Sequence, residues 1–174
     1  AAIYYANRIV QLPLGVFGYA LSSVALSSLS KLASEGKMGE FRLTVSFALR
    51  KLTMALVPSA IVMAILGQVI IRLAFQRGSF DAYSTQITSK ALMFFALGLP
   101  FYGISRIFVS AFYALQDTKT PVKVAALCLV INVVLNFVLM FPLKIGGIAL
   151  ASSISGLVNS WILWTALNKK LKRF

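Results

Sequence analysis

The residues best suited to chemistry near the start of the chain lie at the mouth of a long apolar run. In "YYANRIVQLPLGVFGYAL" (Tyr4 to Leu21), Arg8 stands beside Asn7 and Gln11. A guanidinium keeps its charge at physiological pH, and its planar fork of donors matches the oxygens of a phosphate group. We therefore predict that Arg8, together with Asn7 and Gln11, binds an anionic ligand.

Helical spacing puts Arg8 at the head of a stripe of polar and small residues. The stripe recurs at intervals of three and four residues and continues through Gln11, Gly15, Gly18 and Ser22. We expect it to face a bundle interior or a lumen, although small residues on such a stripe also allow close helix packing. All four acids lie in or beside linkers, which leaves Arg8 without an expected counter-charge: Glu35, Glu40, Asp81 and Asp117.

Two further cations fall inside apolar runs rather than in linkers. Lys90 and Arg106 would each carry a charge at membrane depth, which costs about 2.5 to 3.5 kcal/mol on insertion scales. Both are therefore candidate substrate-binding groups. A structural role stays open for each, because a long side chain near a helix end can reach the lipid headgroups.

A pair of amides forms the second polar feature. Asn132 and Asn136 in "LVINVVLNFVLM" are four residues apart on one helix face, and Ser152 supplies a hydroxyl in the next apolar run. One interpretation is interhelical hydrogen bonding, because a buried amide needs partners. The other is a cation site made of amide and hydroxyl oxygens. With no His and one Cys, Cys128, the chain offers neither a disulfide nor a Cys-rich metal site of its own.

Helices that cross a membrane must position these groups. The chain is 59% hydrophobic and only 12% charged, far from the composition of a soluble domain. Its apolar segments reach or exceed the roughly 20 residues that a membrane-spanning helix needs. We predict an all-α integral membrane protein, a single membrane domain over residues 1–174, with five spans at about 4–33, 42–75, 83–116, 120–141 and 146–168.

The net charge of +13 follows the ends of these spans rather than one solvated face, so nucleic acid is not an expected partner. Alternating spans place most loop cations on one side: Lys31, Lys37, Arg42, Arg50, Lys51, Lys119, Lys123, Lys169, Lys170, Lys172 and Arg173. The other side receives Arg72, Arg77 and Lys144. By the positive-inside rule the first span therefore starts outside the cell.

Two further features bear on the organisation of the chain. Pro13, Pro58 and Pro100 lie inside predicted spans, where proline removes a backbone hydrogen bond, so we expect kinked helices. The sequence opens without Met, a charged n-region or a cleavage site. We expect it to be part of a longer, transporter-sized chain.

Four ordered motifs resemble one known family. The stretch "FYALQDTKTPVKVA" (Phe112 to Ala125) is similar to a motif of the MurJ/MviN lipid II flippases, in the MOP exporter superfamily. The same family is resembled, in the same order, by "YYANRIVQLPLGVFGYAL", "LAFQRGSF" (Leu73 to Phe80) and "PLKIGGIALASSISGLVN" (Pro142 to Asn159). The resemblance covers essentially the whole chain. It implies helices eight to twelve of a fourteen-helix transporter, the larger part of the C-terminal lobe.

The resemblance implies a function without bond chemistry. Such a protein moves lipid II, the undecaprenyl-pyrophosphate-linked peptidoglycan precursor, across the bacterial cytoplasmic (inner) membrane by alternating access. Its implied partners are lipid II, membrane lipids and the N-terminal lobe of the same chain. Arg8 matches a cavity arginine that engages the pyrophosphate, although Asn7 stands where some relatives carry an acid.

The resemblance also bears on cofactors. Some members bind sodium through an Asn and an Asp one turn apart in the eleventh helix. Asn132 and Asn136 take similar places, with Ser152 as a hydroxyl ligand, but Asn136 replaces the acid. We therefore expect no cofactor and keep Na⁺ as an open alternative.

Competing classes remain for the function. A related exporter of another lipid-linked oligosaccharide or of a drug is the nearest alternative, but a cation-drug exporter favours acids at depth, and this chain places none there. A non-transporting scaffold for cell-wall enzymes is more distant. A membrane glycosyltransferase is disfavoured because the chain offers no acidic catalytic pair.

Overall fold

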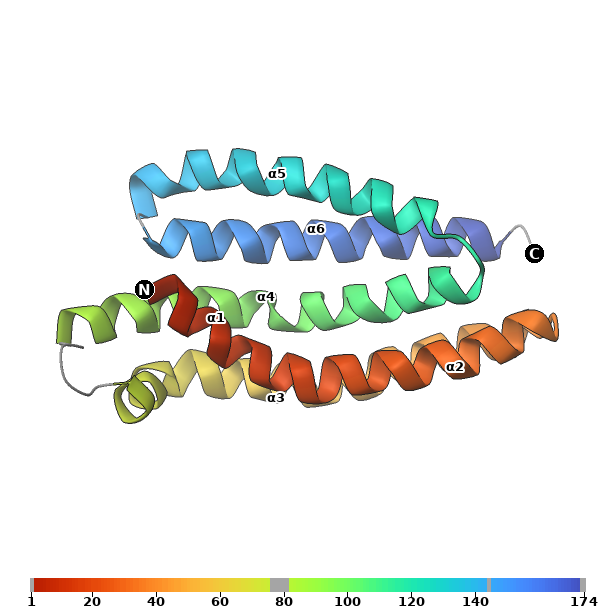
Figure 1. Cartoon of the computed structure of the whole chain (residues 1–174), viewed down its shortest axis with the longest axis horizontal. Helices are drawn as coiled ribbons and strands as arrows, with labels where there is room; N and C mark the ends of the chain where they lie inside the picture. The colour runs from red at the N-terminus through yellow and green to blue at the C-terminus, as the bar shows by residue number, and fades with distance from the viewer. Residues whose placement is uncertain (1, 76–81, 144, 173–174) are drawn as a thin grey trace.

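The computed structural model describes residues 2–75, 82–143 and 145–172 as a bundle of helices. The elements in chain order are α1 (Ala2–Pro13), the π-helix η1 (Leu14–Tyr19), α2 (Ala20–Ser34), α3 (Met38–Phe75), α4 (Ala82–Ala114), α5 (Lys119–Leu143) and α6 (Ile145–Leu171). Figure 1 shows them running lengthwise beside one another.

The predicted all-α membrane architecture is confirmed. Within the described residues, five helical segments are long and apolar enough to cross a membrane: Ile3–Ser34, Met38–Leu73, Gln86–Ala114, Lys119–Pro142 and Gly146–Leu171. The predicted third span, 83–116, runs too far at its C-terminal end. α4 stops at Ala114 because Gln116 has a φ of 59°, a left-handed conformation that ends a helix.

The first span is interrupted where proline predicted a kink. Pro13 has no N–H to donate, and the six residues after it, Leu14 to Tyr19, form a π-helix before α-geometry resumes at Ala20. Figure 1 shows α1 running obliquely to α2. α3 and α4, by contrast, continue as α-helix past Pro58 and Pro100. Of these three prolines in the described residues, Pro13 is the one that a change of helix type follows.

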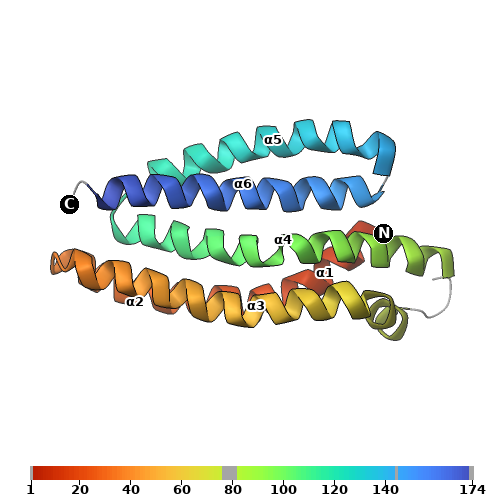
Figure 2. The same cartoon turned by 180° about the vertical axis from the view of Figure 1, so that it is seen from behind.

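α4 is the central helix of the bundle. It packs against α6, α3, α2 and α1, and both views place it between α6 on one side and α3 on the other (Figures 1 and 2). Glycines bring its backbone close to its neighbours. A Cβ on Gly98 would lie 2.9 Å from the Cα of Ser153 in α6, and one on Gly103 would lie 2.3 Å from Leu56 in α3.

The basic loops gather at one end of the bundle. The α2–α3 turn, the α4–α5 connection and the C-terminus lie together there, and the N-terminus lies toward the opposite end (Figure 1). We call this the basic end and define it by Lys37, Asp117 and Lys172. At this end Arg42 of α3 donates a hydrogen bond to the carbonyl of Leu171 at the end of α6.

A partly buried carboxylate joins three segments at the basic end. Asp117 accepts a 2.6 Å bond from Lys170 Nζ in α6, and bonds of 3.0 and 2.8 Å from the backbone N–H and hydroxyl of Thr120 in α5. Burial raises the pKa of the Asp117 carboxyl, but these hydrogen bonds and the Lys170 charge lower it further, to about 2.

Replacement of Gly98 by alanine tests the close approach of α4 to α6. The added methyl would overlap the Ser153 backbone, which cannot move independently of its helix. We expect Gly98→Ala to lower the stability of the full-length protein by about 1 to 3 kcal/mol, measured by thermal unfolding in detergent. Gly39→Ala is the matched control, because a Cβ there meets nothing within 4 Å. Equal stability of the two variants would contradict this packing.

Neutralisation of Asp117 tests the clasp at the basic end. The pKa of Asp117 is lower in the folded protein than its usual 3.8, so its stabilisation is present above pH 3.8 and is lost as the pH falls toward 2. Asp117→Asn should therefore lower stability at neutral pH by about 1 to 2 kcal/mol. The difference from the wild type should shrink across that pH window in thermal unfolding.

The exposed pair between Lys37 and Glu35 supplies the control for this experiment. Its atoms lie 2.8 Å apart, but the side chains are 52% and 36% exposed, and exposed pairs contribute little. Glu35→Gln should leave stability nearly unchanged. If the loss in Asp117→Asn did not depend on pH, the carboxylate would not be its cause.

Candidate functional site

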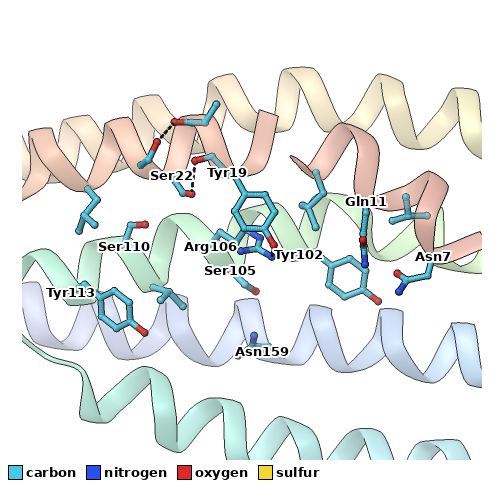
Figure 3. A pocket seen from close by; sticks show the side chains of 16 residues that line it. Asn7, Gln11, Tyr19, Ser22, Tyr102, Ser105, Arg106, Ser110, Tyr113 and Asn159 are labelled. Carbon is cyan, nitrogen blue, oxygen red and sulfur yellow. Dashed lines mark hydrogen bonds between the residues drawn. The ribbon is translucent and has the colours of Figure 1, made fainter. Parts of the chain in front are cut away.

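A cavity of about 1130 Å³, lined by both polar and apolar side chains, lies on the side of α4 that faces α1, η1 and α2, with α6 forming its far edge. We call it the polar cavity. Figure 3 shows polar side chains from these elements pointing into it. Its polar lining residues are Asn7, Gln11, Tyr19, Ser22, Ser23, Tyr102, Ser105, Arg106, Ser110, Tyr113 and Asn159. Among them Arg106 is the one charged residue that the described structure places in the lining.

The Arg106 guanidinium is held by an aromatic ring instead of an acid. Its Nη2 donates a 2.7 Å hydrogen bond to the Tyr19 hydroxyl, and its Cζ lies 3.8 Å from the centroid of the same ring. Contact with a ring face attracts a cation without neutralising it. The cavity therefore keeps a net positive charge in the described part of the chain.

Local sequence explains how these two residues meet. Tyr19 is the last residue of η1, and Gly18 before it is buried beside Leu14, with Arg106 Cδ 3.8 Å from where a Cβ on Gly18 would lie. A π-turn inserts an extra residue and rotates the helix that follows it. The π-helix after Pro13 thus sets the angle at which Tyr19 faces α4.

Two buried polar atoms in the cavity wall have no hydrogen-bond partner among the described residues. They are the hydroxyl oxygen of Ser105 in α4 and the amide oxygen of Asn159 in α6. An unpaired buried polar group is costly, so such groups normally meet water or a ligand. The Ser105 hydroxyl can donate to an anionic group, as Arg106 can, whereas the Asn159 amide oxygen can accept a hydrogen bond from water or from a hydroxyl or amide of a ligand.

Arg8, the main candidate from the sequence, is not among the lining residues. Its neighbours Asn7 and Gln11 line the cavity, but Arg8 is exposed on α1. There it donates a 2.9 Å hydrogen bond to the Tyr4 hydroxyl, with its Cζ 5.0 Å from the Tyr4 ring centroid. A helical step of about 100° per residue separates the direction of Arg8 from that of Asn7. Its predicted role in binding an anion stays a prediction.

The predicted stripe holds in part. Gln11 and Ser22 reach the cavity, and Gly18 is buried beside it, but a Cβ on Gly15 would meet nothing within 4 Å. The stripe assumed α-helical spacing throughout, whereas residues 14–19 are π-helical. Lys90 is exposed on α4 and does not line the cavity.

Asn132 and Asn136 satisfy part of each other's hydrogen-bonding capacity. Asn136 Nδ2 donates a 3.0 Å hydrogen bond to Asn132 Oδ1, while Asn136 Oδ1 is buried without a partner in the described structure. The Ser152 hydroxyl bonds the Ile148 carbonyl of its own helix at 3.1 Å. No group of three or more His, Cys, Asp or Glu able to hold a metal occurs in the described ranges. Sodium binding here stays a prediction.

Several lining residues were not singled out from the sequence. Tyr102, Ser105, Ser110 and Tyr113 lie on one side of α4 with Arg106. Ser105 follows Tyr102 by three residues, and Ser110 and Tyr113 follow Arg106 by four and seven; this helical spacing in an otherwise apolar segment is the signal that could have identified them.

The fold and the cavity together define an all-helical integral membrane protein whose polar cavity lies against a central helix. Comparison with known proteins then identifies the family. A family model described as "Lipid II flippase MurJ" matches residues 1–174. The chain belongs to this family.

Individual relatives agree. The chain is 35% identical to the probable lipid II flippase MurJ of Haemophilus influenzae, an alignment that covers 96% of this chain and 34% of that protein. It is 34% identical to the lipid II flippase MurJ of Thermosipho africanus, over 99% of this chain and 35% of that protein. The chain thus spans about a third of the length of these relatives.

A solved structure supports the same fold. The structure titled "Lipid II flippase MurJ, inward closed conformation" superposes with a TM-score of 0.87 at 32% identity, over 96% of this chain and 35% of that one. The predicted family and fold class are therefore confirmed.

Cysteine labelling tests whether water reaches the cavity. In a full-length background without other cysteines, Cys128 included, Ser23→Cys should react readily with a water-soluble thiol reagent, because Ser23 lines the cavity. Ser153→Cys is the control, since Ser153 is buried between α4 and α6 and bonds the Phe94 carbonyl. Equal reactivity at the two positions would contradict a water-accessible cavity.

Proposed function

We propose that the chain forms the larger part of the C-terminal lobe of a lipid II flippase in the bacterial inner membrane. The protein moves the undecaprenyl-pyrophosphate-linked precursor from the cytoplasmic to the outer leaflet by alternating access. Family membership, the names of the relatives and their greater length support this proposal. Its partners are lipid II, membrane lipids and an N-terminal lobe that closes the open side of the cavity.

The observation that carries the proposal is a permanent cation in a polar cavity without a neutralising acid. Arg106 contacts the neutral Tyr19, and none of the described lining residues is acidic. A pyrophosphate supplies the missing negative charge and accepts bidentate hydrogen bonds from a guanidinium. We assign Arg106 to the pyrophosphate inside the cavity.

Arg8 takes a different part in the proposed mechanism. It is exposed on α1 near the cavity wall that Asn7 and Gln11 form. From there it attracts the anionic headgroup at the edge of the cavity, and movement of α1 about the π-helix brings it inward. The interrupted backbone at residues 14–19 supports this hinge, because π-turns within α-helices are rare and occur frequently at functional sites.

Alternating access then needs no bond chemistry. The pyrophosphate crosses between positively charged and polar groups while two lobes rock about the cavity. The charged head is thereby kept from the hydrocarbon core, where a charge is expensive.

Charge removal in the cavity tests the proposal directly. In the full-length protein, Arg106→Gln should weaken lipid II binding about tenfold and slow its translocation in proteoliposomes, because a charged hydrogen bond contributes about 1.5 to 3 kcal/mol. Arg8→Gln should slow translocation as well. Arg72→Gln, which removes an exposed arginine outside the cavity lining, should change neither measurement.

The alternatives give different results. A scaffold without transport activity predicts no effect of Arg106→Gln or Arg8→Gln on translocation or growth. An exporter of another anionic lipid-linked sugar predicts that both substitutions reduce transport of that lipid and leave lipid II unbound by the wild type. Either result would refute the proposed function.

A further inference from the structure

A second hollow lies on α4, separate from the polar cavity. It has a volume of about 300 Å³, and its floor is formed by Phe101, Ile104 and Phe108 of α4. Leu49 of α3 makes one wall, and Trp161 and Trp164 of α6 make the other. Figure 2 shows α4 lying between α3 and α6. We call this hollow the α3–α4–α6 groove.

The groove is apolar and open to its surroundings. Trp161 is 63% exposed and Trp164 46% exposed, although the two rings contact each other edge to face with centroids 5.8 Å apart. The hydroxyl of Ser160, which also lines the groove, bonds the Leu157 carbonyl at 2.8 Å. The groove therefore offers mainly apolar contact, and the two indole N–H groups are the hydrogen-bonding groups of its lining side chains that have no partner in the described structure.

The tryptophans of the groove indicate its depth in the membrane. Tryptophan concentrates at the boundary between hydrocarbon and headgroups. Leu49, which faces the tryptophans, directly precedes Arg50 and Lys51, the first cations met on α3 from the membrane interior toward the basic end. The groove thus runs from the hydrocarbon region to the headgroup level of the leaflet at the basic end.

A cation, Arg42, lies beyond the groove toward the basic end. Arg42 precedes Leu49 by seven residues, two helical turns, so it lies on the same side of α3 at about 11 Å along the axis. On α6, Leu171 follows Trp164 by the same seven residues, and Arg42 donates to its carbonyl. A guanidinium has five donors, so Arg42 has further N–H groups for an anion.

We propose that the α3–α4–α6 groove holds an acyl chain of an anionic glycerophospholipid from the leaflet at the basic end, with the lipid phosphate at Arg42. The apolar lining takes the chain, and the arginine takes the phosphate bidentately. The chain's net charge of +13 adds a general attraction for anionic lipid.

The shape of the groove favours a lipid chain over a polypeptide. A helix with its side chains is about 10 to 12 Å wide, too wide for a hollow of about 300 Å³. An extended peptide would bring backbone N–H groups against a lining whose two indoles can donate but cannot accept, and unpaired N–H groups are costly in a membrane. A hydrocarbon chain carries no such groups.

Fluorescence quenching by brominated lipids tests the proposal in the full-length protein. The signal of the groove is the part of the tryptophan emission that disappears in the double variant Trp161→Phe/Trp164→Phe. In phosphatidylcholine vesicles, chain-brominated phosphatidylglycerol should quench this part at about fivefold lower mole fraction than chain-brominated phosphatidylcholine, given the usual effect of one interfacial arginine.

A matched pair of variants separates Arg42 from general charge. Arg42→Gln should abolish the preference for phosphatidylglycerol, and Arg42→Lys should retain most of it. Lys51→Gln should leave the preference unchanged. Lys51 Nζ lies 5.5 Å from the ring centroid of Phe47. Both residues are two positions from Leu49 and therefore lie on the other side of α3.

Three results would overturn the proposal. Absence of quenching by either lipid would show that another segment or partner covers the groove. Equal quenching by both lipids in the wild type would show that the groove does not select an anionic headgroup. This comparison uses the wild type alone and does not depend on a variant that folds. A preference lost equally in Arg42→Gln and Lys51→Gln would reduce the effect to general charge. Lipid II transport by the protein is measured separately and affects none of these outcomes.

Discussion

The close approach of α4 to both of its long neighbours is the constraint on which the rest of the structure depends. Three glycine contacts make it possible: Gly98 against Ser153, Gly103 against Leu56, and Gly156 against Tyr102. Without a hydrophobic driving force between helices in lipid, association relies on such close packing. With α6 and α3 held against it, α4 presents one side to a polar cavity and another to an apolar groove.

The second governing interaction is electrostatic. Arg106 lies between a tyrosine ring and a cavity without acidic residues in the described structure, so its charge is oriented but not neutralised. An acid in the place of Tyr19 would form an ion pair with Arg106 and weaken the attraction of Arg106 for an anionic ligand. Tyr19 positions the guanidinium and leaves its charge available. The π-helix that ends at Tyr19 is the local feature that orients this tyrosine.

Much of the fold was predictable because membrane-spanning helices have a strong sequence signal. Length, hydropathy and turn residues located all five spans, and Pro13 predicted the interruption of the first. The predicted end of α4 was two residues too late. The left-handed conformation of Gln116 ends the helix, and glutamine is not a residue type that predicts this conformation.

The candidate site was harder to predict from the sequence. Asn7, Gln11 and Arg106 were identified and line the cavity, whereas Arg8 was ranked first and does not. Arg8 lies in the regular α-helical part of the first span, where its one-residue offset from Asn7 is enough to turn its side chain away from the cavity. The pairing of Arg106 with Tyr19 joins residues 87 positions apart. Such a contact depends on how two helices pack against each other, and the sequence periodicity of a single helix does not reveal this.

A spin-label scan along α4 in membrane-reconstituted full-length protein tests the central position of this helix most directly. Labels at 105, 109, 110 and 113 should be relaxed by a water-soluble nickel reagent, and labels at 101, 104 and 108 by oxygen dissolved in lipid. The account predicts two accessibility maxima on different sides of the helix, each with helical period. A single maximum shared by both reagents, or uniform protection at all seven positions, would contradict it.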